Sequence, residues 1–286
     1  MQSLALTGAD RPFSFEGAIS VLEEGGCAKP LRHNHEDAAL YTVDGELPGD
    51  LATGLLAQSD TLSGVRIRLA SNTTALALTY TPTSSLQRCN FDVVLDGAAE
   101  LTATQDFPPQ YTGEMPVFAG DIMAFLGAMH EIAMSNAPVA HTVKFEGLPG
   151  GEKVIELWLP TIGGCNISKL EIDEGATAAV APDSRPRWLT YGSSITHCMG
   201  LDPSGTARSP SRCWPAVCAQ KAGVHLTNLG YGGQCHMDQA VARMIRDLPI
   251  KPDGFSFKLG INIHNMVRRH NPIPAPGPLP PPRLHP

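Results

Sequence analysis

The pattern of hydrophobic and polar positions changes character about two thirds of the way along the chain. Before that point, short segments alternate apolar and polar residues, as half-buried strands do. The clearest of them span 64–69, 74–80, 90–95, 141–146, 154–159 and 167–172. Turn residues separate them, and Asp96-Gly97 is a strong hairpin signal after which 100–105 can pair back. The pattern predicts an antiparallel, jelly-roll-like β-sandwich over residues 1–182.

Two segments of this first region depart from the strand pattern. Residues 117–133 are apolar and compatible with a short helix. Residues 174–187 are small, polar and proline-bearing, which is typical of a linker. The sequence therefore predicts a domain boundary between residues 182 and 187.

Strand-like and helix-like segments alternate in the region that follows, residues 187–267. Strands are expected at 188–191, 224–229 and 255–259, and helical periods cover 211–222 and 237–248. The apolar helix faces comprise Trp214, Val217, Cys218 and Ala222 in the first helix, and Ala240, Met244 and Ile245 or Leu248 in the second. A βαβαβ order predicts a parallel sheet with right-handed crossovers. In such sheets ligands bind beyond the carboxyl ends of the strands.

Chemistry-bearing residues follow each of these three strands. Gly192-Ser193-Ser194 follows the first, Gly230-Tyr231-Gly232-Gly233 the second, and Gly260-Ile261-Asn262 the third. Gly-Ser-Ser alone also occurs in ordinary turns. Together, however, a hydroxyl, a free backbone N–H and a side-chain amide at one sheet edge constitute a nucleophile with oxyanion donors.

Composition narrows the classes of partner. The chain has 286 residues, a net charge of −7 and no basic run, so no nucleic-acid partner is expected. No apolar stretch approaches about 18 residues, and the start lacks the pattern of a secretory signal, so no membrane association is expected. Seven scattered cysteines do not form a disulfide framework, which favours a cytoplasmic location. The oligomeric state is not predicted.

We expect no metal and no cofactor. His33-Asn34-His35-Glu36 is the one ligand-like cluster, and its turn-rich context favours a solvated loop over a metal site. The glycines from 230 to 233 lack the Gly-x-Gly-x-x-Gly spacing of dinucleotide sites, and there is no Walker A lysine. Thr196 stands where the α/β-hydrolase elbow Gly-x-Ser-x-Gly requires its second glycine.

These motifs resemble the blocks of the SGNH hydrolases (GDSL-type esterases), over about residues 187–265. The resemblance implies an α/β flavodoxin-like three-layer domain. It implies Ser194 as the nucleophile and, through its own N–H, an oxyanion donor, with the Gly233 N–H and the Asn262 side chain as further donors. Ser193 stands where the family usually has Asp. A β-sandwich ahead of this domain is similar to a subset of the family that includes carbohydrate esterases and natural-product acyltransferases.

The last family block, an Asp-x-x-His that carries the general base, has no match here. His197, His236 and His264 are expected near the carboxyl edge, and His264 is the best-placed substitute. Residues 268–286 are proline-rich and predict a disordered or polyproline tail. We interpret 187–267 as a partial SGNH domain, truncated after its third parallel strand. The tail resembles a foreign end from a shifted reading frame or a gene-model error, and a natural proline-rich ligand is the alternative.

Three functional hypotheses remain. The first is a serine esterase for carboxylic esters, with small acyl groups on carbohydrate or natural-product alcohols, weak or inactive because the Asp/His block is missing. The second is a non-catalytic ligand- or carbohydrate-binding sandwich with a decayed hydrolase domain. The third is an acyltransferase that uses the same serine. In the first and third hypotheses the partner is a small-molecule ester.

Overall fold

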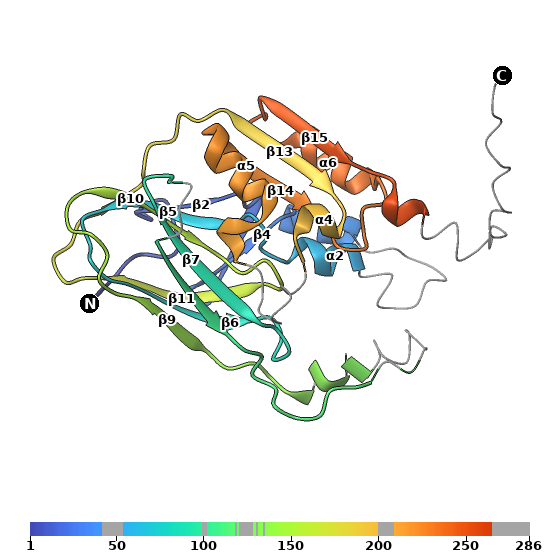
Figure 1. Cartoon of the computed structure of the whole chain (residues 1–286), viewed down its shortest axis with the longest axis horizontal. Helices are drawn as coiled ribbons and strands as arrows, with labels where there is room; N and C mark the ends of the chain where they lie inside the picture. The colour runs from blue at the N-terminus through green and yellow to red at the C-terminus, as the bar shows by residue number, and fades with distance from the viewer. Residues whose placement is uncertain are drawn as a thin grey trace, which may run out of the picture.

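The computed structural model describes residues 1–41, 54–98, 102–117, 119, 128–129, 131–133, 135–199 and 209–264. Two antiparallel sheets pack face to face in the first part of the chain, and a parallel sheet with helices lies beside them (Figure 1). Residues 268–286, predicted to form a tail, lie outside the described residues. Much of the segment 117–133, predicted to be compatible with a short helix, does so as well.

Within the described ranges, the first antiparallel sheet has six strands in the order β3-β4-β11-β6-β9, with β1 paired to β11. Their bounds are Gln2–Ser3 (β1), Ser20–Glu24 (β3), Cys27–Leu31 (β4), Leu76–Pro82 (β6), His141–Phe145 (β9) and Cys165–Ile172 (β11). The second sheet also comprises six strands in the part of the chain that the structure describes, in the order β12-β5-β10-β7-β8, with β2 paired to β5. Their bounds are Ser14–Glu16 (β2), Arg66–Ser71 (β5), Cys89–Leu95 (β7), Ala103–Phe107 (β8), Lys153–Trp158 (β10) and Ala178–Ala179 (β12).

Alternating apolar side chains of both sheets form one core. Leu78 and Leu170 of the first sheet and Leu157 of the second are fully buried. The rings of Tyr80 and Phe91 meet across the sheets with centroids 4.7 Å apart. The predicted antiparallel sandwich is therefore confirmed, whereas its jelly-roll connectivity stays a prediction.

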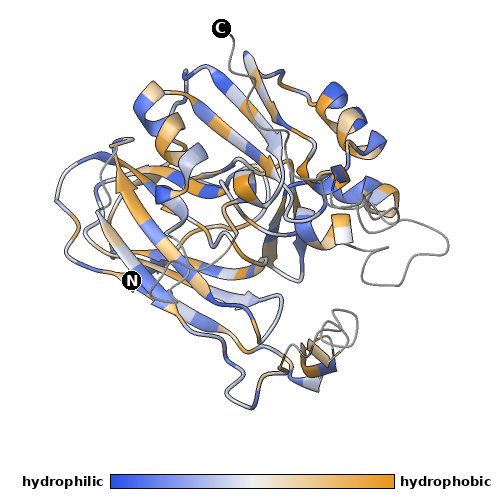
Figure 2. Cartoon of the chain, turned by 45° about the vertical axis from the view of Figure 1, so that its right-hand side comes forward, coloured by the Kyte–Doolittle hydropathy of each residue, from blue (hydrophilic) through white to orange (hydrophobic). Residues whose placement is uncertain are grey.

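The parallel sheet has the order β14-β13-β15. Its elements are β13 (Arg187–Gly192), β14 (His225–Gly230), β15 (Gly254–Lys258), α5 (Trp214–Ala222) and α6 (Gln239–Asp247). Val241 and Met244 of α6 cluster with Leu189, and Ala216 and Ala219 of α5 cluster with Leu226. The predicted βαβαβ order with parallel strands is confirmed, whereas the flavodoxin-like three-layer arrangement stays a prediction. Figure 2 shows helices beside this sheet with apolar and polar residues mixed along them.

Helix α5 turns a different face to the core from the one its sequence predicts. Its small residues Ala216 and Ala219 are buried against Val94 and Trp158 of the sandwich. Trp214, on another face of the helix, remains 38% exposed. The apolar face predicted for this helix is therefore largely unburied.

The segment predicted to be a linker is tied to both parts of the structure. Its strand β12 pairs with β5. The guanidinium of Arg185 donates to Glu16 at 2.8 Å, to Glu156 at 3.1 Å and to Asp183 at 2.8 Å. Arg66 adds an ion pair to Glu16 at 2.6 Å, with both side chains buried. This network joins the sandwich to the start of the parallel sheet.

Arg32 makes a second buried connection between the sandwich and the parallel sheet. Its guanidinium is fully buried and donates to the carbonyl oxygens of Asn228 at 3.0 Å and Gly230 at 2.8 Å. It also donates to the carbonyls of Thr61 at 2.6 Å and Gln58 at 2.5 Å. Burial lowers the pKa of Arg32 to about 10, so the guanidinium stays protonated at neutral pH.

Two further properties of the chain are the state of its cysteines and the length and polarity of its helices. All seven cysteines are free thiols. In the part of the chain that the structure describes, every helix is too short or too polar to cross a lipid bilayer.

We expect Arg32→Met to destabilise the fold by at least about 3 kcal/mol, because several buried carbonyl oxygens would lose their donor at once. Urea unfolding followed by circular dichroism measures the change. Arg246→Met is the control, since Arg246 is 70% exposed in its ion pair with Asp247. Equal midpoints for the two variants would contradict a bridging role for Arg32.

Candidate active site

The carboxyl ends of the three parallel strands lie side by side. Gly192 at the end of the central strand β13 pairs with Gly230 of β14 and with Lys258 of β15. The short helix α4 (Ser194–His197) begins directly after β13, with Ser193 as its extended N-cap residue (Figure 1). The predicted convergence of the three strand ends is therefore present.

Glycines let α4 sit directly on these strand ends. A Cβ on Gly230 would overlap the backbone of His197, and one on Gly192 would overlap the side chain of Thr196. A Cβ on Gly232 would overlap the sulfur of Met199. The overlap at Gly230 is with backbone atoms, so a side chain there would displace α4 from the strand ends.

The two serines differ in exposure. The side chain of Ser193 is fully buried, and its hydroxyl has no hydrogen-bond partner in the described part of the chain. Ser194 is half-buried and lines a cavity of about 570 Å³. Of the pair, Ser194 is thus the one that a substrate can reach.

The glycine-rich loop after β14 has one occupied and one available N–H. The N–H of Gly232 donates to Oε1 of Gln58 at 3.0 Å and to Nδ1 of His197 at 3.3 Å. Gly233 is exposed, has a φ of 72° and has open space beside its Cα. Among the described residues no group accepts its N–H, which makes Gly233 the donor that this loop offers a ligand.

Asn262 lies in the helical turn that follows β15, where the N–H of His264 donates to the carbonyl of Gly260 at 2.8 Å. Its Oδ1 accepts the N–H of Cys235 at 3.0 Å. Because that contact fixes the oxygen, the amide NH₂ is the free end of the side chain. The bond also ties the loop after β15 to the loop after β14.

His197 is a structural residue and not a general base. Its side chain is fully buried, and Nε2 lies 2.6 Å from the carbonyl of Thr161, so Nε2 carries the proton. Nδ1 accepts the N–H of Gly232. Burial and the charge of Arg32 lower the pKa of His197 to about 3. A neutral ring with both nitrogens engaged has no capacity to take a proton from Ser194.

The other two histidines near this edge have no carboxylate partner among the described residues. His264 is exposed and His236 is half-buried. Within the described ranges, neither ring forms an ion pair or a hydrogen bond. A general base in serine hydrolases needs a group that fixes its tautomer and orientation. The described residues therefore place the predicted nucleophile and donors at one sheet edge without an oriented base.

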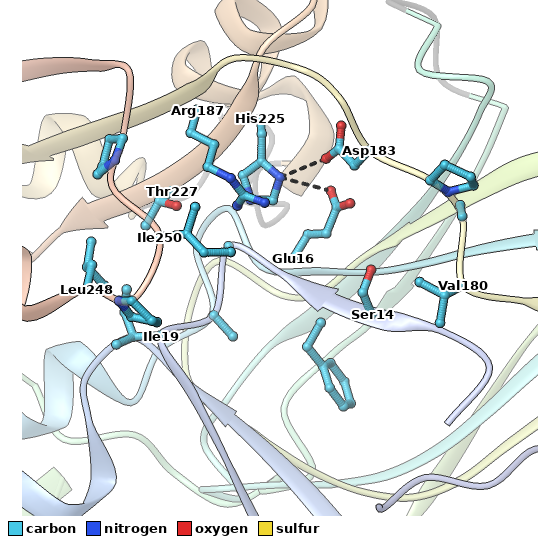
Figure 3. Close-up of a pocket in the computed structure, with 17 residues that line it drawn as sticks. Ser14, Glu16, Ile19, Val180, Asp183, Arg187, His225, Thr227, Leu248 and Ile250 are labelled. Atoms are coloured by element: carbon cyan, nitrogen blue, oxygen red, sulfur yellow. Dashed lines mark hydrogen bonds and ion pairs between the residues drawn. The ribbon is translucent and has the colours of Figure 1, made fainter. Parts of the chain in front are cut away.

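An oriented Asp–His pair exists at the opposite end of the sheet (Figure 3). Nδ1 of His225 lies 2.9 Å from Asp183 and 3.7 Å from Glu16, beside a cavity of about 420 Å³. His225 is the first residue of β14, roughly 17 Å from the carboxyl end of that strand. Burial and the charge of Arg66 lower the pKa of His225 to about 3. This pair is too distant to serve Ser194.

Glu16, Asp183 and His225 also form a group whose ligand atoms lie within 4.8 Å of one another. Both carboxylates already accept hydrogen bonds from Arg185. A divalent cation would have to displace these guanidinium contacts or add charge beside them. The arrangement is that of a buried ion network and not of a metal centre.

The expectation of a solvated loop at His33 to Glu36 is wrong for its first residue. The side chain of His33 is only 2% exposed, and Nδ1 lies 2.9 Å from the hydroxyl of Ser59. The ring also packs against Tyr41 with centroids 5.2 Å apart. His33 is therefore buried beneath the 3-10 helix η1 (His35–Tyr41) and the helix α2 (Gly54–Ser59).

Comparison with known proteins gives matches among solved structures. No protein-family model and no curated sequence matches the chain. The salicylyl-acyltransferase SsfX3 from a tetracycline biosynthetic pathway matches with a TM-score of 0.70 and 27% identity, over 93% of this chain and 65% of that chain. A GDSL-like lipase from Bacteroides ovatus matches with a TM-score of 0.54 and 15% identity, over 91% of this chain and 69% of that chain.

These likenesses confirm the resemblance drawn from the sequence. The chain has an SGNH hydrolase-like fold with an added β-sandwich, a fold shared by enzymes that act on acyl esters. The similarity to the lipase is one of fold alone. The chain spans 65% of the length of the acyltransferase.

The stability of the fold should fall as the pH drops from 7 to 5. Unfolded His197 binds a proton near its ordinary pKa of 6.5, which the folded ring takes up only near 3. The neutral ring makes its full contribution to the free energy of unfolding above pH 6.5. This contribution falls as the pH drops towards 3, and about 2 kcal/mol of it is lost by pH 5. His197→Asn should show a smaller pH slope in urea unfolding. A pH slope in His197→Asn equal to that of the wild type would contradict the assignment.

Proposed function

We propose that this chain carries a serine acyl-transfer site of the SGNH type, with Ser194 as the nucleophile. The N–H groups of Ser194 and Gly233 and the amide of Asn262 are the proposed oxyanion donors. The supporting observation is the hydrogen bonding at the sheet edge: the Gly232 N–H and the Asn262 Oδ1 are occupied. The donors left for a substrate are the ones that an oxyanion requires.

In the proposed reaction, Oγ of Ser194 attacks the carbonyl carbon of an ester. The tetrahedral oxyanion collapses, the bond to the alcohol oxygen breaks, and the alcohol leaves with a proton. Water or an acceptor alcohol then attacks the acyl-enzyme, which distinguishes an esterase from an acyltransferase. His264 is the proposed proton carrier, and its lack of a carboxylate partner among the described residues makes a slow reaction the expectation.

The proposal also includes the domain bounds, the substrate class and the cellular compartment. Residues 1–182 and 187–267 are the proposed sandwich and SGNH domains, with 268–286 as a tail. The acyltransferase match supports a small-molecule ester as substrate. Free thiols at all seven cysteines support a reducing, cytoplasmic compartment. The alternative, a non-catalytic binding module, rests on the unoriented His264, and fluorophosphonate labelling distinguishes the two functions.

A fluorophosphonate probe should label the wild-type chain at Ser194, and Ser194→Ala should abolish the labelling. Ser193→Ala is the matched control, and it should label like the wild type because the Ser193 side chain is fully buried. Peptide mass spectrometry identifies the modified serine. Unlabelled wild-type protein that is folded by circular dichroism would favour the binding module instead.

Asn262→Asp should reduce the rate of labelling, and of p-nitrophenyl acetate hydrolysis, by about 10²–10³-fold, because it removes the amide donor. It keeps an oxygen to accept the Cys235 N–H, so stability should change little. The separate variant His264→Gln should lower the hydrolysis rate below that of the wild type at neutral pH in the same assay. Wild-type rates in Asn262→Asp would exclude that side chain from the oxyanion site, and wild-type rates in His264→Gln would exclude His264 as the proton carrier.

A further inference from the structure

A cavity of about 570 Å³ adjoins Ser194 between α4 and α5. Neither Gly233 nor Asn262 lines it. Besides Ser194, the lining is mostly apolar or sulfur-bearing, with one guanidinium. The lining residues are Ser194, Ile195, Cys198, Met199, Arg212, Cys213, Trp214, Val217 and Cys218.

Three large apolar side chains that line this cavity are exposed. Ile195 is 50%, Met199 39% and Trp214 38% exposed. Helix α5 contributes the face that its sequence marks as apolar, because its alanines and not this face contact the core. Exposed apolar surface that gathers at one hollow is typical of a ligand site.

The aromatic wall of the cavity is fixed in place. The indole N–H of Trp214 donates to the carbonyl of Ile195 at 2.8 Å, and the ring packs against Trp188 with centroids 6.1 Å apart. With its polar atom satisfied, Trp214 presents a preset ring. Methionine and cysteine sulfurs in the same lining make favourable contacts with aromatic rings.

The position of the oxyanion donors shows which part of an ester this cavity suits. The donors on the loops after β14 and β15 lie outside the cavity, so a carbonyl oxygen directed at them leaves its substituents free to extend towards α5. The alcohol must depart and be replaced by water or an acceptor, which requires open solvent. The acyl group stays through both steps, so a preformed cavity beside the nucleophile suits the acyl group.

We propose that this cavity binds the acyl part of the substrate and that this part carries an aromatic ring. The inference rests on the proposed function for the role of the bound group. The recognition of an aromatic carboxylate, however, requires only the cavity and not a reactive serine. The test therefore measures binding.

Cys218 reports occupancy of the cavity, because its thiol is exposed and lines it. Benzoate should slow alkylation of Cys218 by N-ethylmaleimide by the factor 1 + [L]/Kd, about 10-fold at a concentration roughly nine times Kd. Cys27, a partly exposed thiol on β4 of the sandwich, is the internal control and should react at an unchanged rate. Peptide mass spectrometry follows both thiols in one sample.

Acetate and hexanoate, compared at the same concentration, test the aromatic preference. Benzoate should protect Cys218 more than either. Val217→Trp should fill the cavity and abolish protection, whereas Lys221→Trp, an exposed position on the same helix outside the lining, should retain it. Protection by acetate equal to that by benzoate, stronger protection by hexanoate, or full protection in Val217→Trp would each overturn the proposal.

Ser194→Ala separates the two proposals. Benzoate should protect Cys218 in this variant as in the wild type, since binding does not need the hydroxyl. If the fluorophosphonate fails to label Ser194 while benzoate still protects Cys218, the catalytic proposal fails and the aromatic site stands. If the fluorophosphonate labels Ser194 and benzoate does not protect Cys218, the catalytic proposal stands and the aromatic site fails.

Discussion

The arrangement of the candidate site depends on one buried cation. Arg32 extends from the sandwich and satisfies the carbonyl oxygens of Asn228 and Gly230 at the end of β14. A buried guanidinium is stable only where its donors meet acceptors, and a buried carbonyl only where it meets a donor. The guanidinium of Arg32 and the carbonyl oxygens of Asn228 and Gly230 therefore require each other. The glycine-rich loop begins at Tyr231, whose hydroxyl donates back to the carbonyl of Arg32 at 2.9 Å.

The sandwich consequently takes part in the hydrogen bonding at the sheet edge. Gln58 of α2 accepts the N–H of Gly232, and Thr161 fixes the tautomer of His197, which accepts the same N–H. These contacts decide which N–H groups remain for a ligand. Sandwich residues thus contribute to the selection of the proposed oxyanion donors without lining the Ser194 cavity.

Much of the fold was predictable from the sequence because it follows local periodicity. The alternation in 64–69 and the βαβαβ order beyond 187 correspond to β5 and to the parallel sheet. The strand ends at Ser194, Gly233 and Asn262 were predictable for a similar reason: parallel strands align their carboxyl ends by geometry.

Contacts between distant segments were not predictable. His33 and His197 have sequence neighbours compatible with solvent, and both are buried by groups far along the chain, such as Ser59 and Thr161. The face of α5 was misassigned because hydrophobicity alone does not register that small residues allow closer packing. The Ser194 cavity is a consequence of that packing, and its signal in the sequence was an apolar helix face assigned to the core.

The bond between Arg32 and Asn228 also has a consequence for synthesis of the chain. The two residues are 196 positions apart, so the ribosome completes nearly the whole sandwich before the acceptor carbonyls exist. Until β14 forms, the guanidinium of Arg32 lacks the carbonyl oxygens of Asn228 and Gly230 as acceptors. Water must solvate it in that period. Such long-range contacts form late and slow the final docking step. The sandwich is therefore a scaffold that reaches its final packing only when the parallel sheet is in place.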